Sequence, residues 1–216
     1  MAIALDTAVS QRVSSGTNTV PMTIGASANY LVVHVVVLSG TVSVTWNGVS
    51  MTQVGVTATS AANGYKSYSY YLAAPATGTH NIVATQSGST TLYVMGISYS
   101  GVAQTAPEAA VASNPSGGAT SLVQTITTLT ANAWTTCSST NDQQPPNLTA
   151  STNSTLRGSV MDNSVGAFDS NGPIASPGSF SMTQTGGSSV NRMGIILSLA
   201  PLASTASAPD LRLAFL

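Results

Sequence analysis

The chain has 216 residues, of which 5% are charged, and its formal net charge is −1. Nucleic-acid binding needs a concentrated basic surface, and five scattered basic residues do not supply one, so this class of partner is excluded. At 43% hydrophobic the chain can form a core, which excludes a disordered protein; Ser, Thr, Asn, Gln and Gly replace the usual surface charges.

The first strong strand signals are an apolar block and a hairpin. Residues 30–38 form an uninterrupted apolar stretch except for one histidine, as expected of a strand buried on both faces. Residues 42–46 alternate between apolar and polar, the period of a half-buried strand. Asn47 and Gly48 tolerate the positive φ angles of a type I′ turn, so residues 49–51 are predicted to be the return strand.

The remainder of the chain reads as further short strands separated by turns. No internal period of 20 to 50 residues is visible, which argues against a solenoid or a propeller. The middle of the chain is the least regular part. In chain order, the further strands are predicted at residues 68–72, 81–85, 92–99, 121–130, 133–137, 165–168 and 193–199.

The position of the two most apolar blocks indicates the domain organisation. Residues 30–38 and 193–199 lie near opposite ends of the chain, and both must return to the same core. We therefore expect residues 1–201 to form a single domain. Its predicted fold is all-β, an antiparallel β-sandwich of jelly-roll-like type.

Residues 202–216 are predicted to be a linker and a short extended C-terminal arm. In an extended conformation Leu211, Leu213 and Phe215 lie on one face, so the arm presents an apolar ridge. Such a ridge can add to a sheet edge of a partner, and we predict an assembly arm. The alternative is a strand that folds back onto its own domain.

Catalytic and metal sites are not predicted. Six carboxylates and two histidines are spread through the chain without the pairing that acid–base catalysis requires, so we do not expect an enzyme. Asp162, Asp169 and Asn171 form the only acidic cluster, but the spacing matches no EF-hand and Asx turns account for it. No metal or cofactor is expected. Cys137, the single cysteine, is predicted to be a buried apolar side chain.

Three aromatic residues are candidate contacts for a sugar. Tyr65, Tyr71 and Trp134 could offer flat rings on which a glycan stacks. The alternative is that these rings pack in the core or across neighbouring strands.

The sequence shows no pattern typical of an export signal or of a membrane-spanning segment. Asp6 follows the first five residues with no basic segment before an apolar run, so no signal peptide is expected. The nine apolar residues of 30–38 are too short to cross a bilayer. With so few titrating groups, stability is predicted to change little between about pH 5 and 9.

Several blocks carry a resemblance to a known group of proteins. They are residues 1–6 (MAIALD), 31–37, 44–55 (VTWNGVSMTQVG), 71–78 (YLAAPATG), 96–107 and 198–201 (SLAP). Together they resemble β-sandwich structural proteins of tailed bacteriophages, and related modules in secreted bacterial proteins. The blocks are strand and turn signatures, so they imply a fold and carry no functional residues.

The resemblance implies a non-enzymatic virion structural protein. We expect a capsid decoration (cement) protein that is made in the host cytoplasm and located at the virion surface. Its expected partners are the major capsid protein and copies of itself. The copies are expected to form a homo-oligomer, a trimer. Lys66 is the only lysine, so the sheet edges lack their usual protection, and neighbouring subunits could cover them. The alternatives are a tail or fibre component and a carbohydrate-binding or adhesin module. A hydrolase is disfavoured, because no paired carboxylates are apparent.

Overall fold

The computed structural model describes residues 1–14, 16–60, 64–88, 91–114, 118–141, 148–161 and 164–203, and every regular element in them is a β-strand. All pairings are antiparallel, in four sheets. Outer sheet 1 has the order β2 (Thr17–Ile24), β9 (Gly78–Gln86), β4 (Val42–Trp46), β5 (Val49–Ser50). Inner sheet 1 has the order β1 (Ala4–Val13), β10 (Leu92–Ser100), β3 (Tyr30–Val37), β8 (Lys66–Ala73), β6 (Thr52–Gln53), and β7 (Ala58–Thr59) also pairs with β8.

The other two sheets come from the second part of the chain. Inner sheet 2 has the order β11 (Ala109–Ser113), β18 (Arg192–Leu199), β13 (Trp134–Asn141), β16 (Val165–Asp169), β15 (Thr155–Val160). Outer sheet 2 has the order β12 (Ala119–Thr128), β17 (Gly178–Val190), β14 (Thr149–Ala150). The predicted all-β, antiparallel β-sandwich fold is confirmed. The described part of the chain has no helix long and apolar enough to span a membrane.

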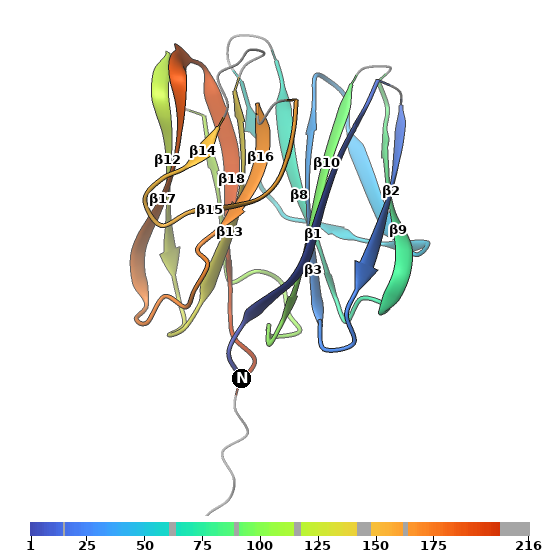
Figure 1. Cartoon of the computed structure of the whole chain (residues 1–216), viewed down its shortest axis with the longest axis vertical. Coiled ribbons are helices and arrows are strands. Elements are labelled where there is room, and N and C mark those ends of the chain that lie inside the picture. The colour runs from blue at the N-terminus through green and yellow to red at the C-terminus, as the bar shows by residue number, and fades with distance from the viewer. Residues whose placement is uncertain are drawn as a thin grey trace, which may run out of the picture.

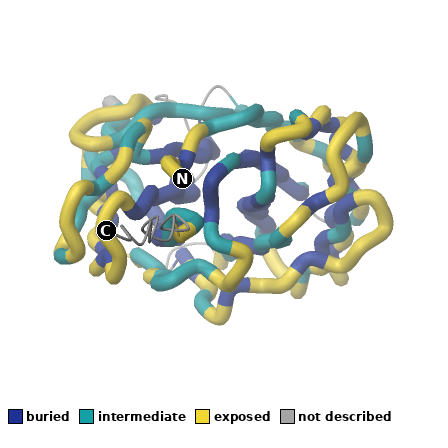
Figure 2. The backbone as a smooth tube through the Cα atoms, turned by 90° about the horizontal axis from the view of Figure 1, so that it is seen from below, coloured by how far each residue is buried: buried dark blue, intermediate teal, exposed yellow. Residues whose placement is uncertain are grey.

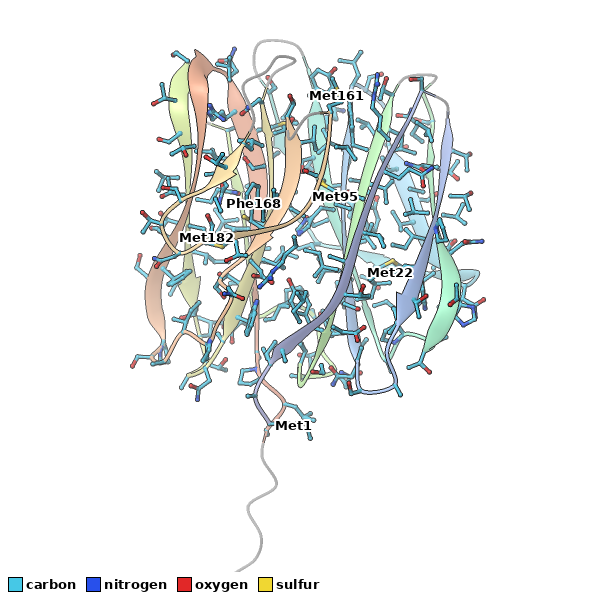
Figure 3. All side chains as sticks on the ribbon, viewed as in Figure 1. Met1, Met22, Met95, Met161, Phe168 and Met182 are labelled. Atoms are coloured by element: carbon cyan, nitrogen blue, oxygen red, sulfur yellow. The ribbon has the colours of Figure 1, made fainter. Side chains whose placement is uncertain are left out.

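The four sheets are stacked as layers, with a hydrophobic core in each of the three spaces between them (Figure 1). The labelled side chains of Figure 3 mark these cores. Met22 lies between outer and inner sheet 1, Met95 lies between the two inner sheets, and Met182 with Phe168 lies between inner and outer sheet 2. The molecule is therefore two sandwiches that share a central core.

Position in the stack explains the burial pattern of each strand. Inner strands such as β3 and β18 are buried along their whole length because they have a layer on both faces, and their sequences are mostly apolar. Outer strand β2 alternates strictly between exposed and buried residues. Seen from below, buried backbone runs through the middle of the stack and exposed backbone surrounds it (Figure 2).

The two apolar blocks near the chain ends meet as expected. Strand β3 contributes Tyr30 and Val32 to the central core, and β18 contributes Met193 and Ile195. This shared core is a physical reason for residues 1–201 to fold as one unit. The single domain itself stays a prediction.

The two sandwiches are built on one repeated strand plan. Reading β11, β12, β13, β14, β16, β17 and β18 in place of β1, β2, β3, β4, β8, β9 and β10 reproduces the order of both sheets. Gly78 and Gly178 begin equivalent strands, and both have a positive φ, +95° and +146°. Equivalent positions lie about 100 residues apart, which is longer than the periods of 20 to 50 residues considered in the sequence. The repeat was therefore not recognised from the sequence.

One carboxylate holds the lower end of the first sandwich. Asp6, at a bulge in β1, accepts hydrogen bonds from Ser98 Oγ of β10 at 2.7 Å and from the backbone N–H of Gly25 at 3.0 Å. The side chain thereby ties together β1, β10 and the turn that follows β2.

A carboxylate makes the equivalent contacts in the second sandwich. Glu108 accepts hydrogen bonds from Ser198 Oγ at 2.7 Å and from the backbone N–H of Leu129 at 2.9 Å. Burial raises the pKa of Glu108, but these hydrogen bonds and those from Thr130 outweigh it and hold the pKa below its ordinary value. Asp6 and Glu108 are thus structural acceptors.

The predicted hairpin is confirmed. Asn47 and Gly48 both have positive φ, 48° and 78°, and link β4 to β5 as a type I′ turn does. Gly48→Val is expected to cost about 1 kcal/mol or more, because a β-branched residue resists positive φ. A Cβ at Gly48 would meet nothing within 4 Å, so a change in the melting transition reports backbone strain alone.

Gly55→Val is the matched control for this variant. A Cβ at Gly55 also meets nothing within 4 Å, but its φ is not positive. Equal losses of stability in the two variants, measured by chemical denaturation, would contradict the assignment of the strain to the turn.

Candidate functional site

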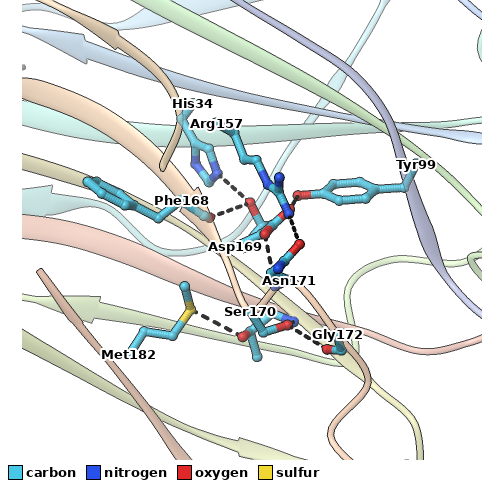
Figure 4. A network of polar contacts seen from close by, with 11 residues as sticks. His34, Tyr99, Arg157, Phe168, Asp169, Ser170, Asn171, Gly172 and Met182 are labelled. Carbon is cyan, nitrogen blue, oxygen red and sulfur yellow. Dashed lines mark hydrogen bonds and ion pairs between the residues drawn. The ribbon is translucent and has the colours of Figure 1, made fainter. Parts of the chain in front are cut away.

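The strongest cluster of ionisable groups lies between the two inner sheets (Figure 4). Asp169, the last residue of β16, is fully buried. Arg157 Nε of β15 lies 2.8 Å from Asp169 Oδ2, an ion pair in which the N–H does not point along the contact. The hydroxyl of Tyr99 donates to the same oxygen at 3.4 Å, and the backbone N–H of Asn171 donates to Oδ1 at 2.9 Å.

A buried histidine lies beside this cluster. His34 Nδ1 is 2.8 Å from Ser69 Oγ, and Nε2 is 3.3 Å from Thr136 Oγ1. Because Thr136 Oγ1 donates its proton to the carbonyl of Phe168, it accepts from His34, which places the imidazole proton on Nε2. Burial lowers the pKa of His34 to about 3, so the ring is neutral near pH 7.

These groups stabilise the packing of the two sandwiches. Aspartate, histidine and tyrosine are residue types that could move protons, but Asp169, His34 and Tyr99 are all 0% exposed, so no substrate reaches them. Buried polar groups of this kind require partners, and here each sandwich supplies partners to the other.

The same geometry accounts for the acidic cluster noted in the sequence. Asp169 and Asn171 do lie together, but Arg157 occupies the position where a cation would bind, since its Nη2 donates to Asn171 Oδ1 at 2.5 Å. Asp162 lies outside the described residues. In the described ranges no three His, Cys, Asp or Glu side chains gather as metal ligands would. Cys137 is buried in the core between inner and outer sheet 2, as predicted.

A pocket of about 210 Å³ opens at the upper end of the seam between the sandwiches. Its wall includes Arg12 and Tyr93 from the first sandwich and Asn141 from the second. The Arg12 guanidinium lies over the Tyr93 ring, 5.9 Å from its centroid, a cation–π arrangement. Sequence patterns did not single out these residues, because they come from separate strands and meet only where the two sandwiches pack.

The three predicted sugar-stacking residues all pack in or against the central core, in different surroundings. Tyr65 lines the seam pocket. Tyr71 stacks on Tyr30 with ring centroids 6.0 Å apart, and Trp134 is 6% exposed and packs against Tyr99. The predicted arm residues lie outside the described residues; they are Leu211, Leu213 and Phe215.

The outward faces of the two outer sheets carry hydroxyl groups in place of charges. On both faces Thr and Ser side chains on neighbouring strands pair across the ladder. The hydroxyl pairs are Thr23–Thr79 at 2.8 Å, Thr17–Thr85 at 3.5 Å, Thr125–Ser181 at 2.8 Å and Thr149–Thr185 at 2.9 Å. The hydroxyl surface inferred from composition is thus found on both outer faces of the stack.

Comparison with known proteins adds no relative. No family model matches this chain, and neither a curated protein nor a solved structure matches it. Its function is therefore argued from the chemistry of its own surfaces.

Proposed function

We propose that this chain is a non-enzymatic virion structural protein of a tailed bacteriophage, a capsid decoration protein that binds the capsid surface and neighbouring copies. The observation that carries the proposal is the division of polar groups between surface and core. Hydroxyl ladders cover the outer faces, whereas the clustered ionisable groups are buried between the sandwiches. Such a molecule is suited to lasting contact with neighbours more than to chemistry.

The use of each described carboxylate supports a non-enzymatic role. Asp6 and Glu108 tie strands together within the two sandwiches, and Asp169 compensates Arg157 at their seam. None of the three is left to act on a substrate, since general acid–base catalysis requires a carboxyl group within reach of the reacting atoms.

The strand order supports a jelly-roll-like topology. In the first sandwich β1-β10-β3-β8 faces β2-β9-β4-β5, and the second repeats the plan as β11-β18-β13-β16 facing β12-β17-β14. Jelly rolls place eight strands in two facing sheets and recur in viral capsid and lectin domains. This is an argument by fold analogy, and it favours the same two classes of function as the sequence.

A binding experiment with phage particles tests the proposal. The full chain is expected to cosediment with gradient-purified heads of the phage that encodes it, and antibodies against it should label the head surface. Deleting residues 210–216 is expected to abolish cosedimentation while leaving the melting temperature nearly unchanged, because the segment is predicted to dock on a partner. Replacing Leu211, Leu213 and Phe215 with Ser keeps the length and should have the same effect.

Two results would contradict this proposal. Labelling of the tail would favour the tail or fibre alternative. A truncated protein that binds heads normally but melts far below the full chain would mean that the arm is a strand of its own domain.

Glycan binding is the second candidate function, and the seam pocket favours it. Tyr65 and Arg12 bring an aromatic ring and a hydrogen-bond donor to its wall, as sugar sites do. A glycan array probed with the intact chain separates the candidates, because decoration of a capsid requires no glycan.

A further inference from the structure

The edges of the four sheets differ in how they are protected against pairing with another chain. Exposed edges are normally blunted by shortness, charge, proline or bulges. Strands β5, β6, β7 and β14 have only two residues each, and β11 has five. Edges this short present few open backbone groups to a partner.

Three of the longer edge strands carry other protection. β1 has a bulge at Asp6 and carries Arg12, and β15 has a bulge beside Arg157. β1 and β15 also cover each other, with Ser10 Oγ donating to the carbonyl of Ser159 at 2.8 Å. β2 contains Pro21, which has no N–H to offer a partner strand.

Strand β12 is the exception. It has ten residues, Ala119–Thr128, none of them charged and none proline, and the one irregularity in its pairing, near its start, comes from extra residues in β17. Among the described strands it pairs only with β17. From Ser121 to Thr128 it has none of these protections, and within the described residues it is an unprotected edge.

The repeated strand plan shows which backbone groups of β12 are open. Ile24 pairs with Gly78 and Thr128 pairs with Gly178, so Ile24 and Thr128 occupy equivalent positions in the two sandwiches. Counting back three residues from each gives Pro21 in β2 and Thr125 in β12 as the next equivalent pair. Pairing of β2 with β9 continues through Pro21, so the nitrogen of Pro21 points away from β9. The N–H of Thr125 therefore points away from β17, toward the open edge, as do those of Val123 and Thr127 two residues to either side.

Exposed apolar side chains are spread along the same edge. Val123 of β12 is 56% exposed and Leu129, directly after β12, is 59% exposed. Val111, on the edge strand β11 of inner sheet 2, is 37% exposed. Few other large apolar side chains in the described ranges are this exposed, so this edge is the best candidate for a covered surface.

We propose that β12 pairs with β12 of a second copy of this chain, antiparallel about a two-fold axis, joining two outer sheets into one. A second copy is the fitting occupant because an antiparallel edge is self-complementary: its open N–H and C=O groups match the same groups of its partner after rotation. Strand β12 has no charged residue, so it does not require a partner strand of opposite charge. The chain's net charge of −1 gives little electrostatic repulsion between two copies.

The symmetry also gives favourable side-chain neighbours. A pairing centred on Gln124 sets Val123 of each copy opposite Thr125 of the other, so the exposed valines are covered by the partner strand. The inference deepens the proposed function by naming the surface through which copies meet, and in that respect it rests on the proposed function. A two-fold pairing joins two copies, so this contact gives a dimer in place of the trimer expected from the resemblance.

Two variants of β12 and one matched control test the contact by sedimentation velocity. Thr125→Pro copies the natural Pro21 of the equivalent strand, so it should remove an outward N–H without breaking the ladder to β17. Val123→Lys places a charge at the edge. Both are expected to weaken the dimer about tenfold or more. Thr19→Lys puts the same charge at the equivalent position of β2 and should leave the dimer intact.

Several outcomes would overturn the inference. They are a wild-type chain that stays monomeric at high concentration, a dimer or trimer that persists in both β12 variants, and equal weakening by Thr19→Lys. If Thr125→Pro fails to fold, Val123→Lys alone decides. Cosedimentation with phage heads is measured separately: heads bound without a β12 dimer overturn this inference only, whereas a dimer that binds no heads overturns only the capsid proposal.

Discussion

Asp169→Ala is expected to lower the free energy of unfolding by about 3 to 5 kcal/mol, because it leaves a mostly buried cation without its partner. Arg157 is 15% exposed and loses the oxygen that lies 2.8 Å from its Nε. The hydroxyl of Tyr99 and the backbone N–H of Asn171 lose their acceptor in the same step. Urea denaturation of the variant and the wild type measures the difference.

A double variant separates the lost charge pair from a general defect. Adding Arg157→Ala to Asp169→Ala removes the uncompensated cation, so the double variant should be more stable than the sum of the two single losses predicts. Strict additivity, or a loss below about 1 kcal/mol for Asp169→Ala, would mean that solvent screens the pair.

Acid is expected to destabilise the protein from about pH 6.5 downward, because His34 is neutral in the folded state. Its folded pKa of about 3 lies below the ordinary value of 6.5, so the unfolded chain takes up the proton first. Stability is thus fully present above pH 6.5 and falls by about 1.4 kcal/mol per pH unit below it, or about 2 kcal/mol at pH 5. The flat profile predicted from composition is therefore restricted to the neutral and alkaline range.

Chemical denaturation at pH 7.5 and pH 5 checks this slope. His34→Gln is expected to remove most of the pH dependence, whatever its effect on stability at pH 7.5. His80→Gln is the control, because it replaces the other histidine of the chain, which is only partly buried beside a turn. The slope is expected to change more in His34→Gln than in this control. An unchanged slope in His34→Gln would rule out the buried imidazole as its cause.

Local patterns in the sequence were sufficient for the fold class and for about half of the strands, whereas β1, β2, β11, β15 and β17 were not predicted. The alternation in residues 42–46, the Asn47-Gly48 turn and the apolar block 30–38 each describe backbone within a few residues, and each appears in the structure as predicted. A period of two and a turn preference act over short stretches of chain, so they can be recognised without tertiary contacts.

The functional groups were harder to predict, because contacts between sheets decide them. Asp169 attracted attention as part of an acidic cluster, but Arg157 and Tyr99, which define its role, reach it from other strands, and Tyr99 comes from the other sandwich. Trp134 was a candidate sugar contact and is buried at the seam, whereas Arg12 and Tyr93 form a pocket that no local pattern marks.

By itself, the sequence determined an all-β protein with few charges and many hydroxyl groups, with several of its strands and its best turn in place. Only the tertiary structure decided that the strands form two copies of one plan, that His34 and Asp169 are sealed between them, and that β12 has a single partner among the described strands while its counterpart carries Pro21. The physical reason is that side-chain alternation specifies which face of a strand is buried, whereas the packing of whole sheets determines what it is buried against and which edge lacks a neighbour.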